Sequence, residues 1–288
     1  MNRKNHWYKE YLSVYGKPYT EIPEEVITSV RERIFQMQSS EPLATISVIA
    51  YNEEHHLMSC LWSLSMMQCR YPIEIIGVNN LSTDRTAIIF EKVGIPFFNE
   101  HRPGCGHARQ CGLSHARGCY HINIDADTMY PPLYVQTLIE ELMKPGIVGV
   151  CSSWSYIPDK EHSGFGLKLY ESARDIYLWL QHFKRPELSV RGLVFAYDTQ
   201  LAQQTGIRTD IIRGEDGSLA LELKRHGRIA FIHTSKARAI TGYGTVGNDG
   251  SLLNSFKIRA IKALKNLGGL FYKKETYKDS DDNLIKNK

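Results

Sequence analysis

The feature that most constrains the fold is an alternation of strand-like and helix-like segments over residues 44–151. The expected strands are short and apolar, and they cover residues 44–50, 73–78, 96–98 and 146–151, with a further strand in residues 120–128 that ends on two aspartates. Apolar residues recur at helical spacing in the intervening segments, which are residues 55–67, 82–94, 106–117 and 132–143. Apolar strands that alternate with helices are typical of a parallel sheet covered on both faces. The sequence therefore predicts an α/β fold.

The chain on either side of this alternation has a different pattern. Residues 1–40 are an expected helical arm, because Ile27, Val30 and Ile34 recur at helical spacing before a break at Ser39–Pro42. Beyond Trp154 the alternation stops. There the sequence predicts helices in residues 164–183, 199–205 and 214–226 and strands in residues 191–196 and 228–233. We expect the first of these helices to be buried against the sheet, and the less favoured alternative is an interfacial membrane helix.

These patterns divide the chain into an arm (residues 1–40), a domain (41–245, with halves that meet near residue 151) and a tail (246–288). In the tail, residues 251–272 mix apolar with basic residues, which is typical of an amphipathic helix that docks on the domain or on an anionic membrane. Six cysteines without a secretion signal indicate reduced thiols and a cytoplasmic protein, at the inner face of the membrane if that segment binds lipid. Basic and aromatic residues do not interleave along one segment, so we expect no nucleic-acid partner.

Two carboxylates, Asp125 and Asp127, end the last strand before the middle of the chain. Positions two apart in an extended segment point the same way, so these side chains can converge on one point. Oxygen ligands at the carboxyl end of a strand suit Mg²⁺ or Mn²⁺ held together with a substrate phosphate. An Asp-x-Asp triplet alone is also common at solvated strand ends, so its function depends on what lies nearby.

Three other groups carry candidate chemistry. Gly104 and Gly106 precede a helix whose N-terminus favours an anion, with Arg109 one turn in. Glu215-Asp216 is either a helix-capping pair or a general base. The last expected strand is followed by His233, Lys236 and Arg238. Either His233 is a metal ligand and the two cations hold a diphosphate, or all three are ordinary residues at a strand end.

A zinc site is a competing interpretation of residues 101–121, where His and Cys recur every four residues at His107, Cys111, His115 and Cys119. A straight helix turns by about 40° over each such interval beyond a full turn, so four of these side chains cannot surround one ion. No Cys-x-x-Cys pair is present. We therefore expect a packed helix face.

Taken in order, the motifs resemble the family 2 glycosyltransferases, which have the GT-A fold. The likeness covers about residues 44–240. It is carried by Ser47–Glu54, Ser82–Thr86, Gly104–Gly112, Asp125–Asp127 and Gly214–Asp216. The resemblance implies a Rossmann-like, mixed but mainly parallel sheet flanked by helices, with a donor half over residues 41–151 and an acceptor half over residues 152–245.

The resemblance also implies roles for individual residues. Asp216, supported by Glu215, would be the catalytic base, and Asp127 and His233 would hold Mn²⁺ or Mg²⁺. The residues that would bind the donor nucleotide and sugar are Ala50, Tyr51, Glu53, Asn79, Asn80, Asp84, Gly106, Arg109, Asp125, Ala126, Lys236 and Arg238. Two departures affect the nucleobase: Asn79-Asn80 replaces the usual aspartate, and Leu81 replaces the usual glycine before Ser-Thr-Asp.

The activity implied is an inverting hexosyltransferase. It would move a sugar from a nucleoside diphosphate, most simply a UDP-sugar, to a hydroxyl of a glycan or lipid-linked acceptor, as in cell-surface polysaccharide or glycolipid synthesis. A homodimer is a further expectation. The alternative is a non-catalytic nucleotide-sugar-binding protein on the same fold. A nucleotidyltransferase would need a Gly-rich basic loop after the first strand, where this chain has the acidic Tyr51–Glu54.

Overall fold

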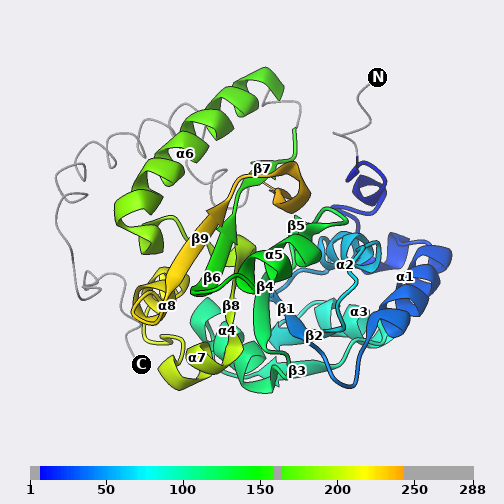
Figure 1. Cartoon of the computed structure of the whole chain (residues 1–288). Coiled ribbons are helices and arrows are strands. Elements are labelled where there is room, and N and C mark those ends of the chain that lie inside the picture. The colour runs from blue at the N-terminus through cyan, green and yellow to red at the C-terminus, as the bar shows by residue number, and fades with distance from the viewer. Residues whose placement is uncertain (1–6, 159–163, 243–288) are drawn as a thin grey trace.

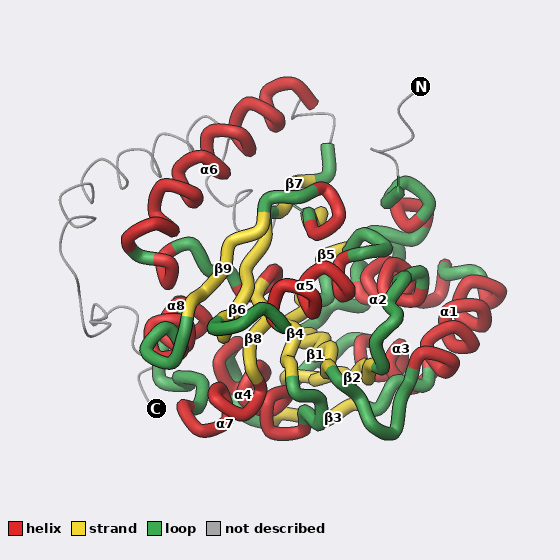
Figure 2. Tube along the Cα trace, viewed as in Figure 1, coloured by secondary structure: helices red, strands yellow, loops and turns green. Residues whose placement is uncertain are grey.

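The core of the protein is a seven-stranded sheet with helices on both faces (Figures 1 and 2). The computed structural model describes residues 7–158 and 164–242. The strand order is β3-β2-β1-β4-β8-β6-β9, and β8 alone runs antiparallel to its two neighbours. These strands are β1 (Ala44–Ala50), β2 (Ile73–Asn80), β3 (Phe97–Glu100), β4 (Tyr120–Asp125), β6 (Ile147–Ser152), β8 (Phe195–Asp198) and β9 (Arg228–Ile232). The mixed, mainly parallel sheet is as expected.

The helices cover both faces of the sheet. One hydrophobic cluster joins the sheet to α1, α2, α3 and α5, and a second joins it to α4, α7 and α8. These helices are α1 (Glu24–Met37), α2 (Leu57–Ser65), α3 (Thr86–Val93), α4 (Cys105–His115), α5 (Tyr134–Leu142), α7 (Thr199–Thr205) and α8 (Glu215–Leu223). Alternate residues of β1 explain this division, since Ile46 and Val48 belong to the first cluster while Ser47 faces α4.

Helix α4 packs closely on the sheet because it carries Gly112. A Cβ at this position would overlap the Oγ of Ser47 on β1, so any larger residue would push the helix away. The close approach fixes the N-terminus of α4 beside the carboxyl ends of β1 and β2. This is the helix that bears Arg109.

The strand register brings the polar motifs to one edge of the sheet. Ala50 at the end of β1 pairs with Asn79 of β2, and Ile49 pairs with Asp125 of β4. Parallel strands that end together place their following loops side by side, and ligands of open α/β sheets bind at this edge. The residues that follow the three strands therefore surround a common space.

The N-terminal arm packs on the main body. Helix α1 starts directly after Pro23 and lies against α2 and α3, and its Ile27, Val30 and Ile34 are buried in the first cluster. Pro23 suits this position because a residue that ends a loop before a helix needs no backbone N–H. The expected helix in the arm is confirmed. The division of the chain near residues 40, 151 and 245 stays a prediction, and residues 246–288 lie outside the described residues.

Three features differ from the sequence-based expectation, and two of them concern the strands. The strand expected at residues 191–196 lies at Phe195–Asp198, because Gly192–Val194 forms a 3₁₀ turn first. A small second sheet pairs three very short strands, β5 (Thr128–Met129), β10 (Ala239–Thr241) and β7 (Trp154–Tyr156). Strands of two or three residues are too short to produce a periodic pattern.

Helix α6 (Gly164–Lys184) is the third difference. Leu167, Tyr170 and Leu178 are buried in the first cluster, but the opposite face of the helix carries exposed apolar side chains. The expectation of a buried helix is therefore wrong for that face. Within the described ranges, no helix combines the length and apolar character needed to cross a membrane.

Candidate active site

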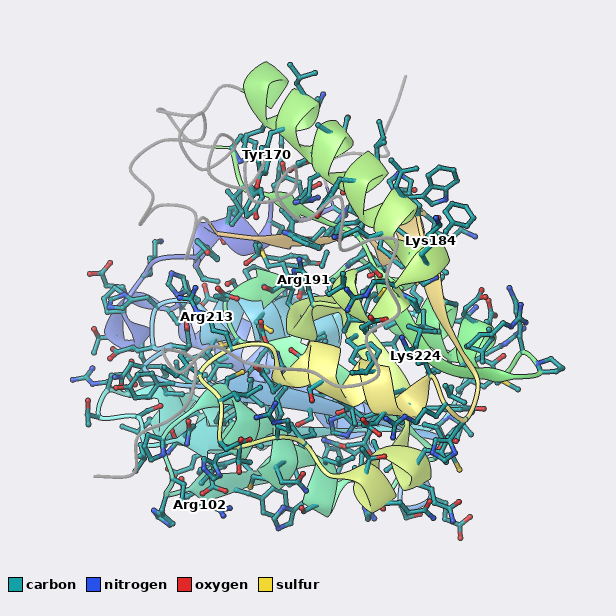
Figure 3. All side chains as sticks on the ribbon, turned by 90° about the vertical axis from the view of Figure 1, so that its left-hand side faces the viewer. Arg102, Tyr170, Lys184, Arg191, Arg213 and Lys224 are labelled. Atoms are coloured by element: carbon teal, nitrogen blue, oxygen red, sulfur yellow. The ribbon has the colours of Figure 1, made fainter. Side chains whose placement is uncertain are left out.

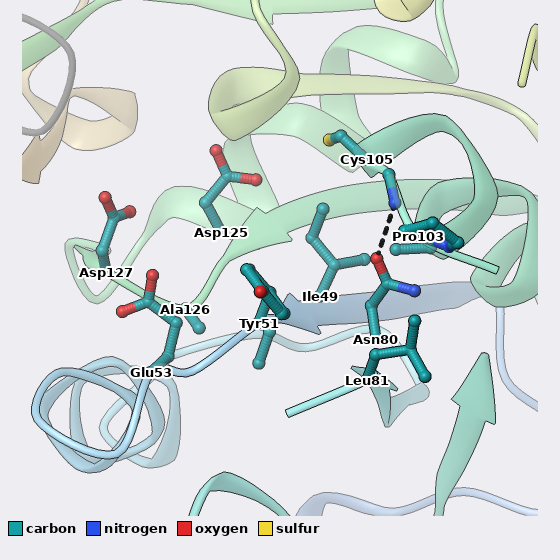
Figure 4. Close-up of a pocket in the computed structure, with 13 residues that line it drawn as sticks. Ile49, Tyr51, Glu53, Asn80, Leu81, Pro103, Cys105, Asp125, Ala126 and Asp127 are labelled. Carbon is teal, nitrogen blue, oxygen red and sulfur yellow. Dashed lines mark hydrogen bonds between the residues drawn. The ribbon is translucent and has the colours of Figure 1, made fainter. Parts of the chain in front are cut away.

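A pocket of about 470 Å³ lies at the carboxyl ends of β1 and β4 (Figure 4). It is lined by Ile49, Ala50, Tyr51, Glu53, Asn80, Leu81, Pro103, Gly104, Cys105, Ala108, Asp125, Ala126 and Asp127. Seven of these thirteen residues were predicted to bind the donor or the metal. The pocket has a size suited to a small organic ligand.

One end of the pocket is acidic. Glu53, Asp125 and Asp127 gather there (Figure 4). Thr128 donates a hydrogen bond to Asp127 at 2.9 Å, but burial and the charges of Asp125 and Glu53 raise the pKa of Asp127 to about 6. Like charges placed this close repel one another unless a cation lies between them.

The acidic end fits a divalent cation bound together with a substrate. Its donors are carboxylate oxygens, which Mg²⁺ and Mn²⁺ prefer. Within residues 7–158 and 164–242, however, no group of three or more His, Cys, Asp and Glu side chains is arranged to hold a metal ion. A cation held here by Asp127 would depend on phosphate oxygens of a ligand for part of its coordination.

The N-terminal arm supports this end of the pocket. Glu53 accepts a hydrogen bond from Nδ1 of His56 at 2.8 Å, and this hydrogen bond raises the pKa of the imidazole. The ring of Tyr15 lies 4.7 Å from that of His56. Sequence reasoning assigned no role to Tyr15 or His56, because neither belongs to the motifs that suggested the pocket.

Asparagines organise the opposite end of the pocket. The amide Nδ2 of Asn80 donates to the backbone oxygens of Glu100 and Arg102 at 3.1 and 2.7 Å, and its Oδ1 accepts from the N–H of Gly104 at 3.1 Å. Asn79 similarly accepts from the N–H of Ser82 at 3.3 Å. The Asn80 amide therefore holds the loop after β3 in place, and the Asn79 amide holds the start of the loop after β2.

Two residues beside the pocket have left-handed backbone conformations, Asn52 (φ 54°) and Leu81 (φ 59°). The Oδ1 of Asn52 accepts from the N–H of Thr83 at 2.8 Å, which ties the loops after β1 and β2 together. Asparagine tolerates this conformation, whereas leucine is strained in it. Leu81 nevertheless projects an apolar side chain into the pocket opposite the acidic end (Figure 4).

Arg109 connects the pocket to the pair at the start of α8. Its side chain is 2% exposed, and its Nη2 lies 2.8 Å from Oδ1 of Asp125. Its Nε lies 3.2 Å from Asp216 and 3.6 Å from Glu215. One buried guanidinium therefore faces carboxylates from β4 and from α8. The close α4–β1 packing and the first turn of α8 bring these groups together.

Asp216 is the member of this group that has the properties of a base, and its side chain is 12% exposed. Burial raises its pKa to about 8; Arg109 opposes this shift, and Glu215 and Asp125 add to it. The Oδ1 of Asp216 accepts a hydrogen bond from Asn123 at 3.1 Å, and Asn123 in turn accepts from the hydroxyl of Tyr197 at 3.2 Å. A carboxylate with a pKa near 8 can take a proton efficiently near neutral pH.

Gly192 makes this arrangement sterically feasible. A Cβ at this position would overlap Nη2 of Arg109 and Oδ2 of Asp216. Gly192, Asn123 and Tyr197 were all missed by sequence reasoning. Asn123 lies two residues before Asp125 on the same strand, so the alternation of β4 was a signal for it; Gly192 gave no signal.

Other predicted site residues have contacts outside the pocket lining. The carboxylate of Asp84 accepts hydrogen bonds from the N–H groups of Glu54 and Thr86 at 3.0 and 2.9 Å. Burial alone would raise the pKa of Asp84, but these hydrogen bonds and the one from the Thr86 hydroxyl lower it. A Cβ on Gly106 would overlap the backbone oxygen of Arg208. These contacts position the loops around the pocket.

The predicted residues after β9 lie beside α6. Arg238 pairs with Asp175 of α6 and donates to the backbone oxygen of Trp154 at 3.1 Å. His233 Nδ1 lies 3.8 Å from Asp175, and Lys236 is exposed on the turn Ser235–Ala237. The metal role of His233 and the diphosphate role of Lys236 and Arg238 stay predictions.

Known proteins resemble this chain in sequence and in structure. The sequence model of Glycosyl transferase family 2 matches residues 45–218. The chain is 25% identical to "Uncharacterized glycosyltransferase RP339" of Rickettsia prowazekii over 67% of its length, and 26% identical to "Uncharacterized glycosyltransferase EpsJ" of Bacillus subtilis over 60%. The matches span 62% and 56% of those relatives.

Solved structures share the architecture. The mannosyltransferase PcManGT of Pyrobaculum calidifontis, in complex with GDP-Man and Mn²⁺, superposes with a TM-score of 0.55 at 18% identity, covering 83% of this chain and 76% of that one. TarS of S. aureus (residues 1–349) in complex with UDP gives 0.54 at 17% identity, covering 69% and 60%. At these identities the likeness establishes the fold. The chain belongs to Glycosyl transferase family 2 and has the GT-A fold.

Proposed function

We propose that the protein transfers a hexosyl group, with inversion, from a nucleoside diphosphate sugar to a hydroxyl of a glycan or lipid-linked acceptor. The observation that carries the proposal is the position of Arg109, 2.8 Å from Asp125 in the pocket and 3.2 Å from Asp216. Arg109 therefore links the pocket that would bind the donor to Asp216, which would act as the base. Synthesis of a cell-surface polysaccharide or glycolipid suits such an acceptor.

The donor would lie along the pocket, with its diphosphate at the acidic end and its base at the other. Mn²⁺ or Mg²⁺ held by Asp127 would neutralise the diphosphate and make it a better leaving group. Tyr51, which is 63% exposed, offers a ring face for the nucleobase, and Leu81 and Pro103 offer apolar surface. A UDP-sugar is the donor we favour, and the complexes of TarS with UDP-GlcNAc and of PcManGT with GDP-Man and Mn²⁺ support a sugar nucleotide in this fold.

Asp216 would remove the proton of the acceptor hydroxyl as its oxygen attacks the anomeric carbon. The attack forms the new C–O bond on the face opposite the departing diphosphate, so the configuration inverts. Asn123 holds the carboxylate in place, and Glu215 keeps it basic through the repulsion that raises its pKa. Asp125, paired with Arg109, would contact the ribose or the transferred sugar.

A thermal-shift screen tests the proposal. UDP-, GDP-, CDP- and TDP-sugars are each added with and without Mn²⁺, to the native chain and to Asp127→Asn. We expect one sugar nucleotide to raise the melting temperature in the presence of Mn²⁺ and to lose most of this shift in the variant. Absence of any shift would refute donor binding. A shift without Mn²⁺-dependent release of nucleoside diphosphate would instead identify a non-catalytic nucleotide-sugar-binding protein.

A further inference from the structure

Helix α6 lies at the outer edge of the protein (Figure 1). It carries a stripe of exposed apolar side chains. Between 50% and 66% of each is accessible to solvent, and they are Leu169, Ile176, Trp179, Leu180 and Phe183. Residues seven, four and three apart lie on one side of a helix, so four of them form a continuous line and Trp179 lies beside it. Trp179 and Phe183 make an edge-to-face contact, with ring centroids 4.6 Å apart.

The opposite face of α6 is fully engaged with the body of the protein. Figure 3 shows Tyr170 on the inner side of the helix and Lys184 at its end. Leu167, Tyr170 and Leu178 are buried, so the helix does not need its outer stripe for docking. A contiguous exposed apolar surface of this kind marks an interaction site.

The inner face of α6 carries both acidic side chains of the helix together with Arg174, whose side chain is 9% exposed. The acidic side chains turn inward: Glu171 accepts hydrogen bonds from the Ser155 hydroxyl and the Tyr156 N–H at 2.9 and 2.7 Å, and Asp175 pairs with Arg174 and Arg238. The exposed charged side chains of the helix are Lys168 and Lys184, one near each end. The outer face therefore combines apolar and cationic groups.

We propose that this face of α6 lies on the interface of an anionic lipid bilayer. Aromatic and aliphatic side chains that enter the acyl boundary, flanked by lysines that meet the headgroups, are the features of an interfacial helix. A second copy of the chain would place lysine-bearing faces against each other. Residues 251–272, which lie outside the described residues, also carry lysines and arginine among their apolar residues. Charge complementarity therefore favours an anionic surface over either of these partners.

Contact of α6 with a bilayer would also determine which acceptors can reach the site, an inference that rests on the proposed function. Arg238 contacts Asp175 on the inner side of α6. A bilayer on the outer side would hold the acceptor half of the domain next to the membrane. The acceptor class that suits this arrangement is a lipid-linked sugar with its hydroxyl at the headgroup level.

Vesicle co-sedimentation of the full chain tests the proposal without donor or cation. The vesicles are phosphatidylcholine alone, or with about one-third phosphatidylglycerol. The native chain should sediment with the anionic vesicles, and the variant Ile176→Gln/Trp179→Gln/Phe183→Gln should bind at least about tenfold less. The matched control is Phe35→Gln, which removes an apolar side chain that is 80% exposed on α1 and should bind as the native chain does.

Fluorescence gives a second readout that does not depend on the triple variant. Anionic vesicles should shift the emission of the native chain to the blue, and Trp179→Phe should remove this shift while leaving the binding intact. Equal sedimentation of the triple variant and the native chain would overturn the proposal. So would loss of binding only on substitution of Phe256, Ile261 and Leu264, or a change of oligomeric mass in the α6 variant without any change in vesicle binding. Donor-induced thermal shifts are read separately, so failure here leaves the proposed function unaffected.

Discussion

The Nη2 of Arg109 lies 2.8 Å from the Oδ1 of Asp125, and the arginine is buried to 2% exposure. The same guanidinium faces the carboxylates of Asp216 and Glu215, so a single cation neutralises part of a cluster of negative charge. Removing buried charge partners is costly because the remaining charges cannot be solvated. The pair therefore connects the stability of the fold to the chemistry of the site.

Arg109→Lys should preserve the charge but lose the fork that reaches Asp125 and Asp216 together. We expect release of nucleoside diphosphate to fall by about 10²-fold, with a smaller loss of stability. Arg109→Met leaves the carboxylates without a counter-charge and should lower the free energy of unfolding by about 3–5 kcal/mol. Urea titration and a turnover assay measure both effects. Native-like turnover in Arg109→Lys would show that the bridge is not needed.

Asn80→Asp should destabilise the loop after β3. The substitution replaces an amide that donates to the oxygens of Glu100 and Arg102 with an oxygen that repels them. We expect a loss of about 1–3 kcal/mol in the free energy of unfolding and weaker donor binding. Asn79→Asp keeps the acceptor for the Ser82 N–H and loses one donation, to Asn99, where Asn80→Asp loses two, so it should cost less. If both variants were equally stable, the hydrogen bonds of Asn80 would not be holding the loop.

Leu81→Gly should relieve the strain of the left-handed conformation at φ 59°. The relief is worth about 1–2 kcal/mol, and the greater entropy of glycine in the unfolded chain removes about 0.5–1 kcal/mol of it, so the net effect should be a small gain in stability. The matched control is Ile88→Gly on α3, which has the same 39% exposure and should lose stability. Thermal unfolding of both variants tests this prediction. A loss of stability of similar size in each variant would mean that Leu81 is not strained.

The pKa of Asp216 has a consequence for folding stability. It is raised from 3.8 to about 8, so the folded state binds this proton more tightly than the unfolded state does. Its contribution is therefore fully present below about pH 4 and is lost as the pH rises through about 8. The free energy of unfolding, measured in urea from pH 4 to pH 9, should fall less steeply in Asp216→Asn than in the native chain. Parallel curves would contradict the shift.

Much of the sheet could be predicted because its strands are buried on both faces, which leaves an almost wholly apolar pattern such as Ala44–Ala50. Strand β8 was misplaced because the 3₁₀ turn at Gly192–Val194, which passes over Arg109, delays its start. The acidic and amide residues of the pocket could be predicted because they follow strands that end at one edge. The contact of Arg109 with Asp216 could not, because it joins residues more than a hundred positions apart through packing. The exposed face of α6 was hidden for a related reason, since apolar residues on both sides of a helix look buried.

Turnover by Asp216→Asn tests the central claim most directly, measured as release of nucleoside diphosphate across pH with the donor and Mn²⁺ that stabilise the native chain. In the native protein, kcat/KM should rise with pH up to about 8, as Asp216 ionises. In the variant the rise should disappear and turnover should fall by about 10²–10⁴-fold, while donor binding stays as in the native chain. Native turnover in Asp216→Asn, with the same rise, would contradict the account of this site.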